Sequence, residues 1–449
     1  MDATFQLIVA PELEPFRPEI DYVFTCLERR FHIRRESQAT TRLYYGTGQC
    51  PGDVAAIPPH FFPTAISVDD DGVRLQRAAF DHLAMSPGWK PRSPVKLVRE
   101  HDLDLIGLIF FLLSGIEERD AARTDRYGRF TLAQNWLEQC GLFGVALADR
   151  ALEALAKRIT VVPKPRACAF PLIMPTHDVD RLRAYHRWYD PARYAAGDIV
   201  KRGKLKRGIK HLSAWFRLEP WNSARRIMQL SEELELASRF YFMGPSDAPQ
   251  DSPYAVRDTA RLRALLGEIT ARGHVSGFHP GFNTATSAVE WRTQHLGLQA
   301  IANSRPPDEG RQHALRYDIA KTPAIWAQAG MELDLSCGFP ERSGFRNGAA
   351  HFHPAYDLVN RSPLNVLRGA TSIMDFGFFG GKYRDLSEDA ALAEADAVMR
   401  EAVAVGGHIV LLFHTGHTEA RHWSLYERII RRAHELTRVY KASATPSEP

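Results

Sequence analysis

Short apolar runs alternate with amphipathic stretches over the second part of the chain. The apolar runs predict strands over 171–180, 238–244, 274–278, 331–336 and 408–416. Apolar positions that recur every three or four residues predict helices over 222–237, 257–273, 322–330 and 387–407. Because near-continuously apolar strands alternate with helices, we expect a parallel sheet covered by helices, either an α/β barrel or a layered sheet.

The first part of the chain has a different pattern. A strand-like start, "FQLIVA", is followed by a Pro-rich middle and by helical patterns around 101–118 and 131–158. A connector with two prolines, "VVPKPRACAF", separates this block from the alternating one. The chain has 449 residues, which is more than one ordinary domain. We therefore expect an α/β or α+β domain of unknown function over 1–165, a second domain over 166–440, and a disordered tail over 441–449.

The composition is that of a globular protein. Hydrophobic residues make up 45% of the chain, and a net charge of +4 is too small for this length to indicate a nucleic-acid partner. The five cysteines are scattered without a CxxC pair, which fits reduced thiols. The N-terminus does not read as a signal peptide, and "LIGLIFFLLSG" from Leu105 is shorter than the roughly 20 residues that span a bilayer. We expect a cytoplasmic protein without a transmembrane segment.

A basic run, "KRGKLKRGIK" over 201–210, has six basic residues in ten. Such runs are usually solvated surface. The alternative is a docking surface for an anionic partner, such as a phosphate-bearing glycolipid or a nucleotide sugar, which leaves peripheral membrane contact open.

Polar residues of the types that bind metals or transfer protons follow the predicted strands. The carboxyl ends of parallel strands meet at one edge of a sheet, so these residues can converge. They are His177, Asp178, Asp180, His279, Asn283, Arg311, His313, Arg316, Asp334, Arg346 and His414. Asp178 and Asp180 would repel each other unless a cation or a shifted pKa relieves the repulsion, although an Asp here could instead cap the following helix. A carboxylate with imidazoles is a usual ligand set for Zn²⁺ or Fe²⁺-type metals.

In order and spacing, "THDVD", "HPGFN", "LRYD", "LDLS" and "LLFH" resemble the motifs of NodB-homology polysaccharide deacetylases, carbohydrate esterase family 4. The resemblance covers roughly residues 168–440. "RQHALRYD", "GFRNG" and "DRYGRF" at 125–130 are similar to a bacterial subgroup tied to surface-polysaccharide gene clusters, which carries an extra N-terminal domain. The resemblance implies a distorted parallel (β/α) barrel that removes N-acetyl groups from amino sugars of a surface polysaccharide or its precursor.

The resemblance also implies roles for single residues. Asp178 falls where the family has its catalytic base, and His414 falls where it has its catalytic acid. Arg316, or alternatively Arg311, falls where an arginine orients the base. The residues expected to contact the amino-sugar glycan are His177, Asp334 and Arg346.

The implied cofactor is a divalent metal, with Zn²⁺ favoured over Co²⁺, Ni²⁺ or Fe²⁺. Asp180 and His279 match metal ligands of the family. The usual second motif, H-x-x-x-H, is broken here because position 283 is Asn, and an amide oxygen is a poorer ligand for such metals than imidazole. Either Asn283 takes part or His313 arrives from the next segment.

Three functions are compatible with these residues. The first is a metal-dependent N-deacetylase, and the second is an O-deacetylase or another hydrolase on the same fold. The third is a non-catalytic member that binds glycan, which Asn283 favours and the pair Asp178 and His414 opposes.

Overall fold

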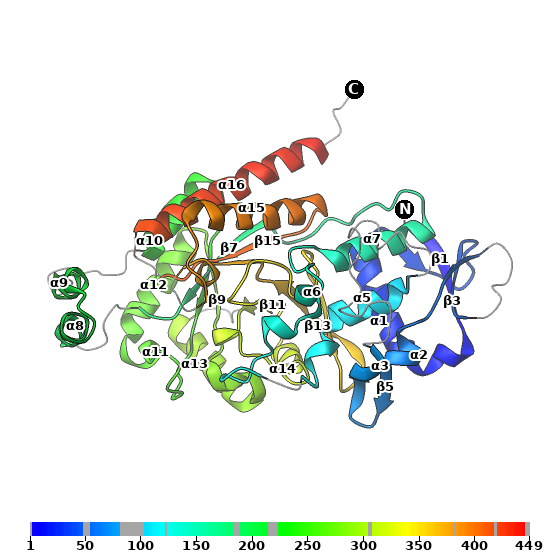
Figure 1. Ribbon diagram of the computed structural model, residues 1–449, viewed down its shortest axis with the longest axis horizontal. Coiled ribbons are helices and arrows are strands. Elements are labelled where there is room, and N and C mark those ends of the chain that lie inside the picture. Colours follow the sequence, from blue (N-terminus) through cyan, green and yellow to red (C-terminus); the bar gives the residue numbers. More distant parts are fainter. Residues whose placement is uncertain are drawn as a thin grey trace.

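The computed structural model describes residues 2–47, 54–80, 103–121, 124–182, 189–213, 223–303, 308–379, 383–416 and 420–444. Its centre is a nine-stranded sheet in the order β12-β13-β11-β10-β9-β8-β7-β15-β14 (Figure 1). The strands are β7 (Ile173–Val179), β8 (Arg239–Phe242), β9 (Val275–Phe278), β10 (Glu309–Gly310), β11 (Leu333–Cys337), β12 (His353–Asp357), β13 (Ser362–Ala370), β14 (Ile373–Met374) and β15 (Ile409–Leu412). Neighbouring strands run parallel, except that β12 is antiparallel to β13. The expected α/β class with a parallel sheet is confirmed.

The expected barrel is not closed by strand pairing within the described ranges, because β12 and β14 form the two ends of the sheet. The sheet is nevertheless curved, since side chains of strands that are not neighbours pack together. Met174 of β7, Tyr241 of β8 and Leu335 of β11 belong to one buried cluster. Only Thr371 and Ser372 separate β13 from β14. The chain therefore passes directly from one end of the strand order, where β13 lies next to the edge strand, to the other end, where β14 is the edge strand.

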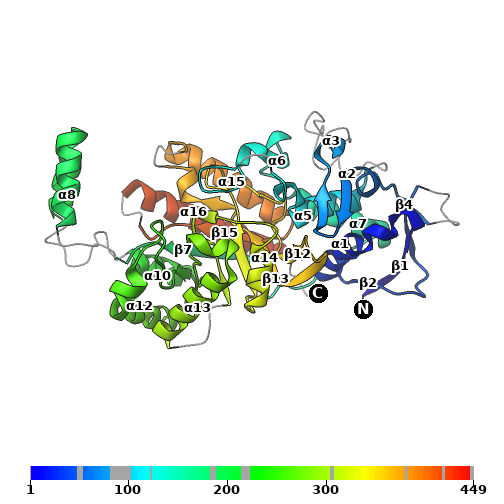
Figure 2. The same cartoon turned by 90° about the horizontal axis from the view of Figure 1, so that it is seen from below.

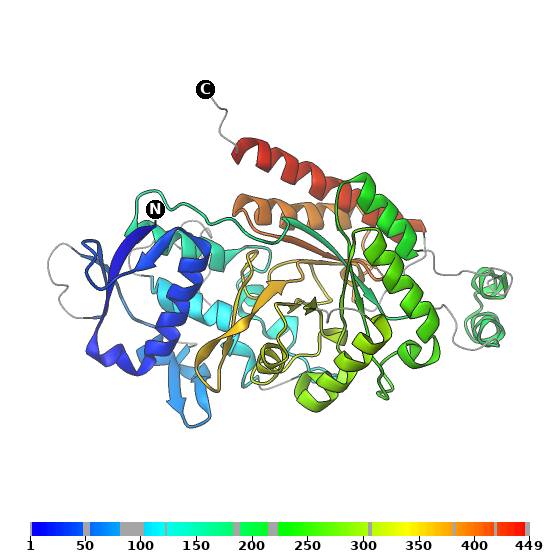
Figure 3. The same cartoon turned by 180° about the vertical axis from the view of Figure 1, so that it is seen from behind.

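Helices cover the outside of this sheet (Figure 3). They are α10 (Ser223–Glu233), α11 (Tyr254–Arg257), α12 (Thr259–Ala271), α13 (Ala288–Ala302), α14 (Thr322–Gln328), α15 (Glu388–Ala404) and α16 (Ala420–Ala444). The predicted helices correspond to α10, α12, α14 and α15, whereas the sequence pattern did not predict α13 or β12–β14. Helix α16 extends to Ala444, so 441–444 are helical rather than disordered, and 445–449 lie outside the described residues.

A helical hairpin stands apart from the sheet and its covering helices (Figures 1 and 2). It consists of α8 (Asp190–Ala196), the π-helical turn η4 (Gly197–Lys201) and α9 (Leu205–Ser213). It follows β7 in the chain, and β7 is the strand that carries Asp178.

The first part of the chain contains a second sheet, of four parallel strands in the order β2-β1-β3-β4. Its elements are β1 (Ala3–Val9), α1 (Arg17–Arg30), β2 (Ile33–Arg35), β3 (Arg42–Tyr45), β4 (Ala55–Ile57), α2 (Phe62–Ala65), the hairpin β5 (Ile66–Asp69) and β6 (Gly72–Leu75), α3 (Arg77–Phe80), α5 (Leu105–Ser114), α6 (Trp136–Gln139) and α7 (Leu147–Ile159). Every residue of α5 is buried, and the Asp104 carboxylate caps it by accepting from the Gly107 N–H at 2.8 Å. No described helix is both long and apolar enough to cross a membrane.

This first part packs on the edge of the large sheet. The Tyr22 hydroxyl of α1 donates to the Pro354 carbonyl of β12 at 2.8 Å. Arg361, which precedes β13, forms an ion pair of 2.8 Å with the buried Glu19 of α1. The division into two domains near residue 165 stays a prediction, and the two predicted parts share buried contacts.

Candidate active site

Asp178 lies near the carboxyl end of β7 and is held by a buried arginine. Arg311, directly after β10, donates from Nη1 to Asp178 Oδ1 at 2.7 Å and from Nη2 to Thr176 Oγ1 at 2.7 Å. Its Nε donates to Thr371 Oγ1 at 3.0 Å, and the whole side chain is buried. The guanidinium therefore fixes the orientation of the Asp178 carboxylate and balances its charge inside the curved sheet.

Arg316, which was expected to hold Asp178, has other partners. It donates to the carbonyl oxygens of Phe282 at 2.8 Å and Tyr127 at 3.2 Å, and its guanidinium lies over the Phe282 ring. The reason is the shortness of β10, which consists of Glu309–Gly310 and ends immediately before Arg311. Arg311 is therefore the residue at the strand end, and the assignment of Arg316 was wrong.

Asp180, His279 and His313 come together beside Asp178. Each offers one ligand atom, and these atoms lie within 4.8 Å of one another. His279 Nε2 is 3.4 Å from Asp180 Oδ1 and 3.8 Å from Asp178 Oδ2. Asp180 Oδ1 is buried and accepts no hydrogen bond from the described residues. Burial raises the pKa of Asp180, but the nearby imidazoles of His279, His414 and His313 lower it by more than burial raises it. The net pKa is therefore below its ordinary value.

Both imidazoles are held by hydrogen bonds on the side away from the cluster. His279 Nδ1–H donates to the Arg311 carbonyl at 2.5 Å, and His313 Nδ1 is 2.6 Å from Asp251 Oδ1. These contacts use Nδ1 of each ring and not Nε2, an arrangement common for histidines that bind metals. Asn283 is exposed in the 3-10 helix η6 (Phe282–Thr286), and the histidine that joins Asp180 and His279 is His313.

His414 lies two residues beyond β15, the strand that pairs with β7. Leu412 of β15 pairs with Thr176 of β7, and the Thr415 N–H is 3.5 Å from the Asp178 carbonyl oxygen. The Asp375 carboxylate accepts from His414 Nδ1 at 2.7 Å and from the His414 N–H at 2.6 Å. Burial alone would lower the pKa of His414, but the negative charges of Asp375, Asp180 and Asp178 raise it to about 9. The imidazole is therefore protonated at neutral pH.

His177 faces away from this cluster, because successive residues of a strand point to opposite faces. It is fully buried, its Nδ1 is 2.9 Å from the Phe413 carbonyl, and its ring lies 4.9 Å from the Phe240 ring. Burial lowers the pKa of His177 to about 3, so the ring is neutral. The expected substrate contact of His177 was wrong: the side chain packs between the sheet and its helices.

The two other residues expected to contact substrate are satisfied within the protein. Asp334 accepts from the Tyr317 hydroxyl at 2.8 Å, and burial raises the pKa of its carboxyl. Arg346 is buried, pairs with Glu118 at 2.6 Å and donates to the Gly338 carbonyl. In the described structure neither residue forms a hydrogen bond or ion pair with Asp180, His279 or His313, and both side chains have structural partners, so their expected contact with the glycan stays a prediction.

A segment from the first part of the chain, residues 125–130, contacts the turn that carries His313. Arg129 donates from Nη1 to the Ala314 carbonyl at 2.7 Å, and its guanidinium is paired with Asp125 at 2.7 Å. Ala314 has φ 57° and Leu315 has φ 50°, a backbone region that non-glycine residues rarely adopt. The contact from Arg129 thus supports a strained turn directly after His313.

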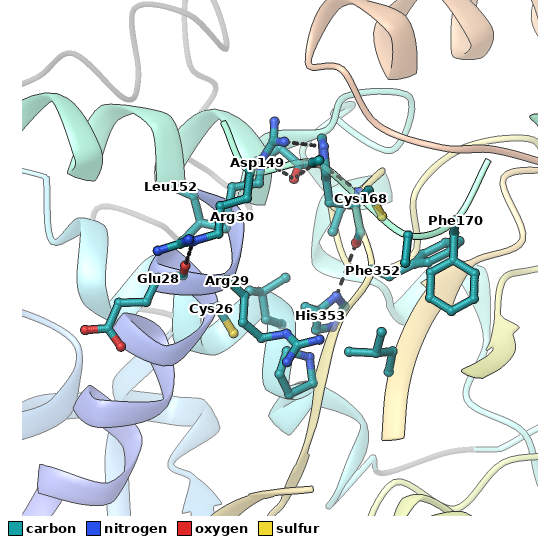
Figure 4. Close-up of a pocket in the computed structure, with 18 residues that line it drawn as sticks. Cys26, Glu28, Arg29, Arg30, Asp149, Leu152, Cys168, Phe170, Phe352 and His353 are labelled. Carbon is teal, nitrogen blue, oxygen red and sulfur yellow. Dashed lines mark hydrogen bonds and ion pairs between the residues drawn. The ribbon is translucent and has the colours of Figure 1, made fainter. Parts of the chain in front are cut away.

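A cavity of about 430 Å³ lies away from this cluster, between α1, α7 and β12 (Figure 4). It reaches Phe170, which precedes β7, and Cys168, whose Sγ is 3.2 Å from Nε2 of His408 directly before β15. These are the amino ends of the two strands, whereas Asp178 and His414 lie at their carboxyl ends. The cavity is therefore not part of the candidate active site.

No family model and no curated protein matches the sequence. Two solved structures are similar in part. One is a protein from Mycobacterium smegmatis assigned to the polysaccharide deacetylases, with 15% identity, a TM-score of 0.38, and coverage of 62% of this chain and 93% of that one. The other is a polysaccharide deacetylase from Bacillus cereus, with 11% identity, a TM-score of 0.28, and coverage of 48% and 83%. Because both scores are low, the functional conclusion rests on the geometry of the site.

Proposed function

We propose that this protein is a metal-dependent hydrolase that removes N-acetyl groups from amino sugars of a bacterial surface polysaccharide or its precursor. One observation carries the proposal. Asp178 and His414 flank the three-residue cluster Asp180, His279 and His313. The Asp178 carboxylate is held by the buried Arg311, and the His414 imidazole is held by the Asp375 carboxylate. One proton acceptor and one proton donor beside a candidate metal site is what amide hydrolysis requires.

The cluster fits a divalent transition metal. Two imidazoles and one carboxylate leave coordination positions open for water and substrate, and Zn²⁺ accepts this set. Asp180 Oδ1 is buried and accepts no hydrogen bond from the residues that the structure describes, so it is an atom that such an ion would satisfy. When bound, the ion would polarise the acetyl carbonyl and lower the pKa of a coordinated water.

The proposed proton transfers follow from the partners of the two flanking residues. Asp178, paired with Arg311 and aimed by it, accepts a proton from the attacking water. His414, protonated because of Asp375, donates a proton to the leaving amine. An exposed aromatic ring, Phe376, has its centroid 4.3 Å from that of the His414 ring and offers a face on which a sugar can stack.

The substrate test compares amide with ester. Acetate release is measured from N-acetylglucosamine oligosaccharides and from O-acetylated xylan oligosaccharides, with Zn²⁺ or Co²⁺ added after chelation. We expect metal-dependent release from the amide. Release from the ester alone would favour an O-deacetylase, and binding of either oligosaccharide without release would favour a non-catalytic glycan-binding protein.

The pH dependence should reflect His414. We expect kcat/KM to fall as the pH rises through about 9, because His414 then loses the proton that it donates. Asp375→Asn removes the largest charge that raises this pKa, so the alkaline limb should move toward the ordinary value of 6.5. A limb that stays in place in the variant would show that His414 is not the group that titrates.

Arg129→Ala should weaken metal binding, although Arg129 is not one of the proposed metal ligands. Direct hydrogen-bond partners of ligand residues, as Asp251 is of His313, contribute about 10- to 100-fold to metal affinity. Arg129 acts one residue further away, through Ala314, so its loss should cost at most about 10-fold. Co²⁺ affinity, measured by competition with a chromophoric chelator, should fall by up to that factor. Arg126→Ala, an exposed change in the same segment, is the matched control. Equal affinities in the two variants would contradict the positioning role.

A further inference from the structure

The hairpin α8-η4-α9 carries a concentration of exposed apolar side chains. Large apolar residues are usually exposed singly over a protein surface. Within this hairpin and its entry, six are exposed: Tyr189, Tyr194, Val200, Leu205, Ile209 and Leu212. Leu205, Ile209 and Leu212 recur at positions i, i+4 and i+7 of α9, so they share one helical face. Leu205 is 59% exposed and Ile209 is 55% exposed, so most of this face is uncovered in the described structure, and Val200 of η4 is 81% exposed.

The same hairpin is strongly basic. Residues 201–210 include six basic residues. Lys201, Arg202, Lys204 and Lys206 are exposed. An apolar helical face bordered by lysines and arginines is the pattern of helices that lie in the interface of an anionic lipid membrane.

The hairpin is built as a unit rather than as an irregular loop. Asp198 is buried, accepts from Arg202, and lies 3.0 Å from His211 Nε2 of α9, so it ties the two helices together. A Cβ at Gly208 would lie 2.3 Å from Ile199 Cγ1, so the glycine permits close packing of α9 on η4. These internal contacts use Asp198, His211 and Ile199, and they leave the exposed apolar side chains on the outside.

We propose that this hairpin docks the protein on a membrane surface rich in anionic lipids. Burial of the apolar face in the lipid interface removes it from water, and the basic side chains approach the lipid phosphates. A second copy of the chain would have to bring the same basic residues together, so the charge favours lipid over self-association. One consequence rests on the proposed function: the hairpin follows β7, so docking would bring the strand end with Asp178 and Asp180 close to substrates at the membrane.

The test measures binding of the full chain to vesicles, without reference to activity. We expect co-sedimentation with phosphatidylglycerol vesicles at low salt, weakening in 0.5 M NaCl, and none with phosphatidylcholine. The variant Lys204→Glu, Lys206→Glu should bind at least 25-fold more weakly, at about fivefold for each basic residue lost. The variant Leu205→Ser, Ile209→Ser should also lose binding.

Matched controls place the same changes elsewhere. Arg257→Glu, Arg292→Glu changes the same number of exposed charges, and Val289→Ser, Leu296→Ser changes exposed apolar residues of α13. Both should bind vesicles as the parent does, and all variants should release acetate from a soluble substrate at the parent rate.

No binding of the parent, or equal loss in the controls, would overturn the proposal. Association of the parent into dimers that the hairpin variants abolish, or binding to RNA in preference to vesicles, would also overturn it. Failure of acetate release with intact vesicle binding would overturn only the proposed function.

Discussion

Asp178→Asn is expected to lower kcat for acetate release by about 10² to 10⁴, the usual contribution of a general base. The amide keeps the shape of the side chain and can still accept from Arg311, so the fold should be retained, although the buried Arg311 loses its charge partner and the thermal unfolding midpoint should fall. What is lost is the ability to take a proton from the attacking water. Asp70→Asn, the same change at an exposed position, should leave kcat unaltered.

His414→Ala should have an effect of similar size, because it removes the proton donor for the leaving amine. The two losses should differ with the leaving group. A substrate whose leaving group needs no protonation, such as 4-nitrophenyl acetate, should be hydrolysed by His414→Ala nearly as fast as by the parent, but not by Asp178→Asn. Near-parental acetate release from the sugar amide by either variant would refute the acid–base pair.

Arg311→Ala should be the most destabilising substitution in the site. Arg311 is fully buried and donates to Asp178, Thr176 and Thr371, so its removal leaves the Asp178 carboxylate buried without its charge partner. Breaking a buried pair in this way costs about 3–5 kcal/mol. Urea denaturation should show a decrease of that size in the free energy of unfolding, together with loss of turnover.

Arg316→Ala is the matched comparison, because it lies five positions further along the same segment. It is only partly buried and donates to two backbone carbonyls, so its removal should cost about 1–2 kcal/mol and leave Asp178 in place. If Arg316→Ala abolishes turnover while Arg311→Ala keeps it, Arg311 does not orient the base.

The order of strands and helices in the second part of the chain could be predicted, because these segments have strong periodicity. Strand β10 could not, since Glu309–Gly310 is too short to form an apolar run. That omission led to the choice of Arg316 over Arg311. The orientation of His177 could have been predicted, because residues 177 and 178 of one strand must face opposite ways.

Asp180, His279, His313 and His414 could be named from the sequence, whereas their hydrogen-bond partners could not. Asp375 follows the two-residue strand β14 and has no periodic signal before it. Asp251 belongs to an irregular loop, and only the fold brings it to His313, 62 residues further along the chain. The proximity of residues 125–130 to this turn likewise depends on packing between distant segments, which local patterns do not encode.

The identity of the third metal ligand tests the account most directly. The measurement is the amount of Zn²⁺ bound per chain, determined by plasma emission spectroscopy after saturation and exhaustive dialysis, for the parent, His313→Ala and Asn283→Ala. We predict about one ion per chain in the parent and in Asn283→Ala, and substantial loss in His313→Ala, because the imidazole of His313 is the nitrogen that joins Asp180 and His279. Full occupancy in His313→Ala with loss in Asn283→Ala would contradict this ligand set, and no uptake by the parent would contradict the metal-dependent mechanism itself.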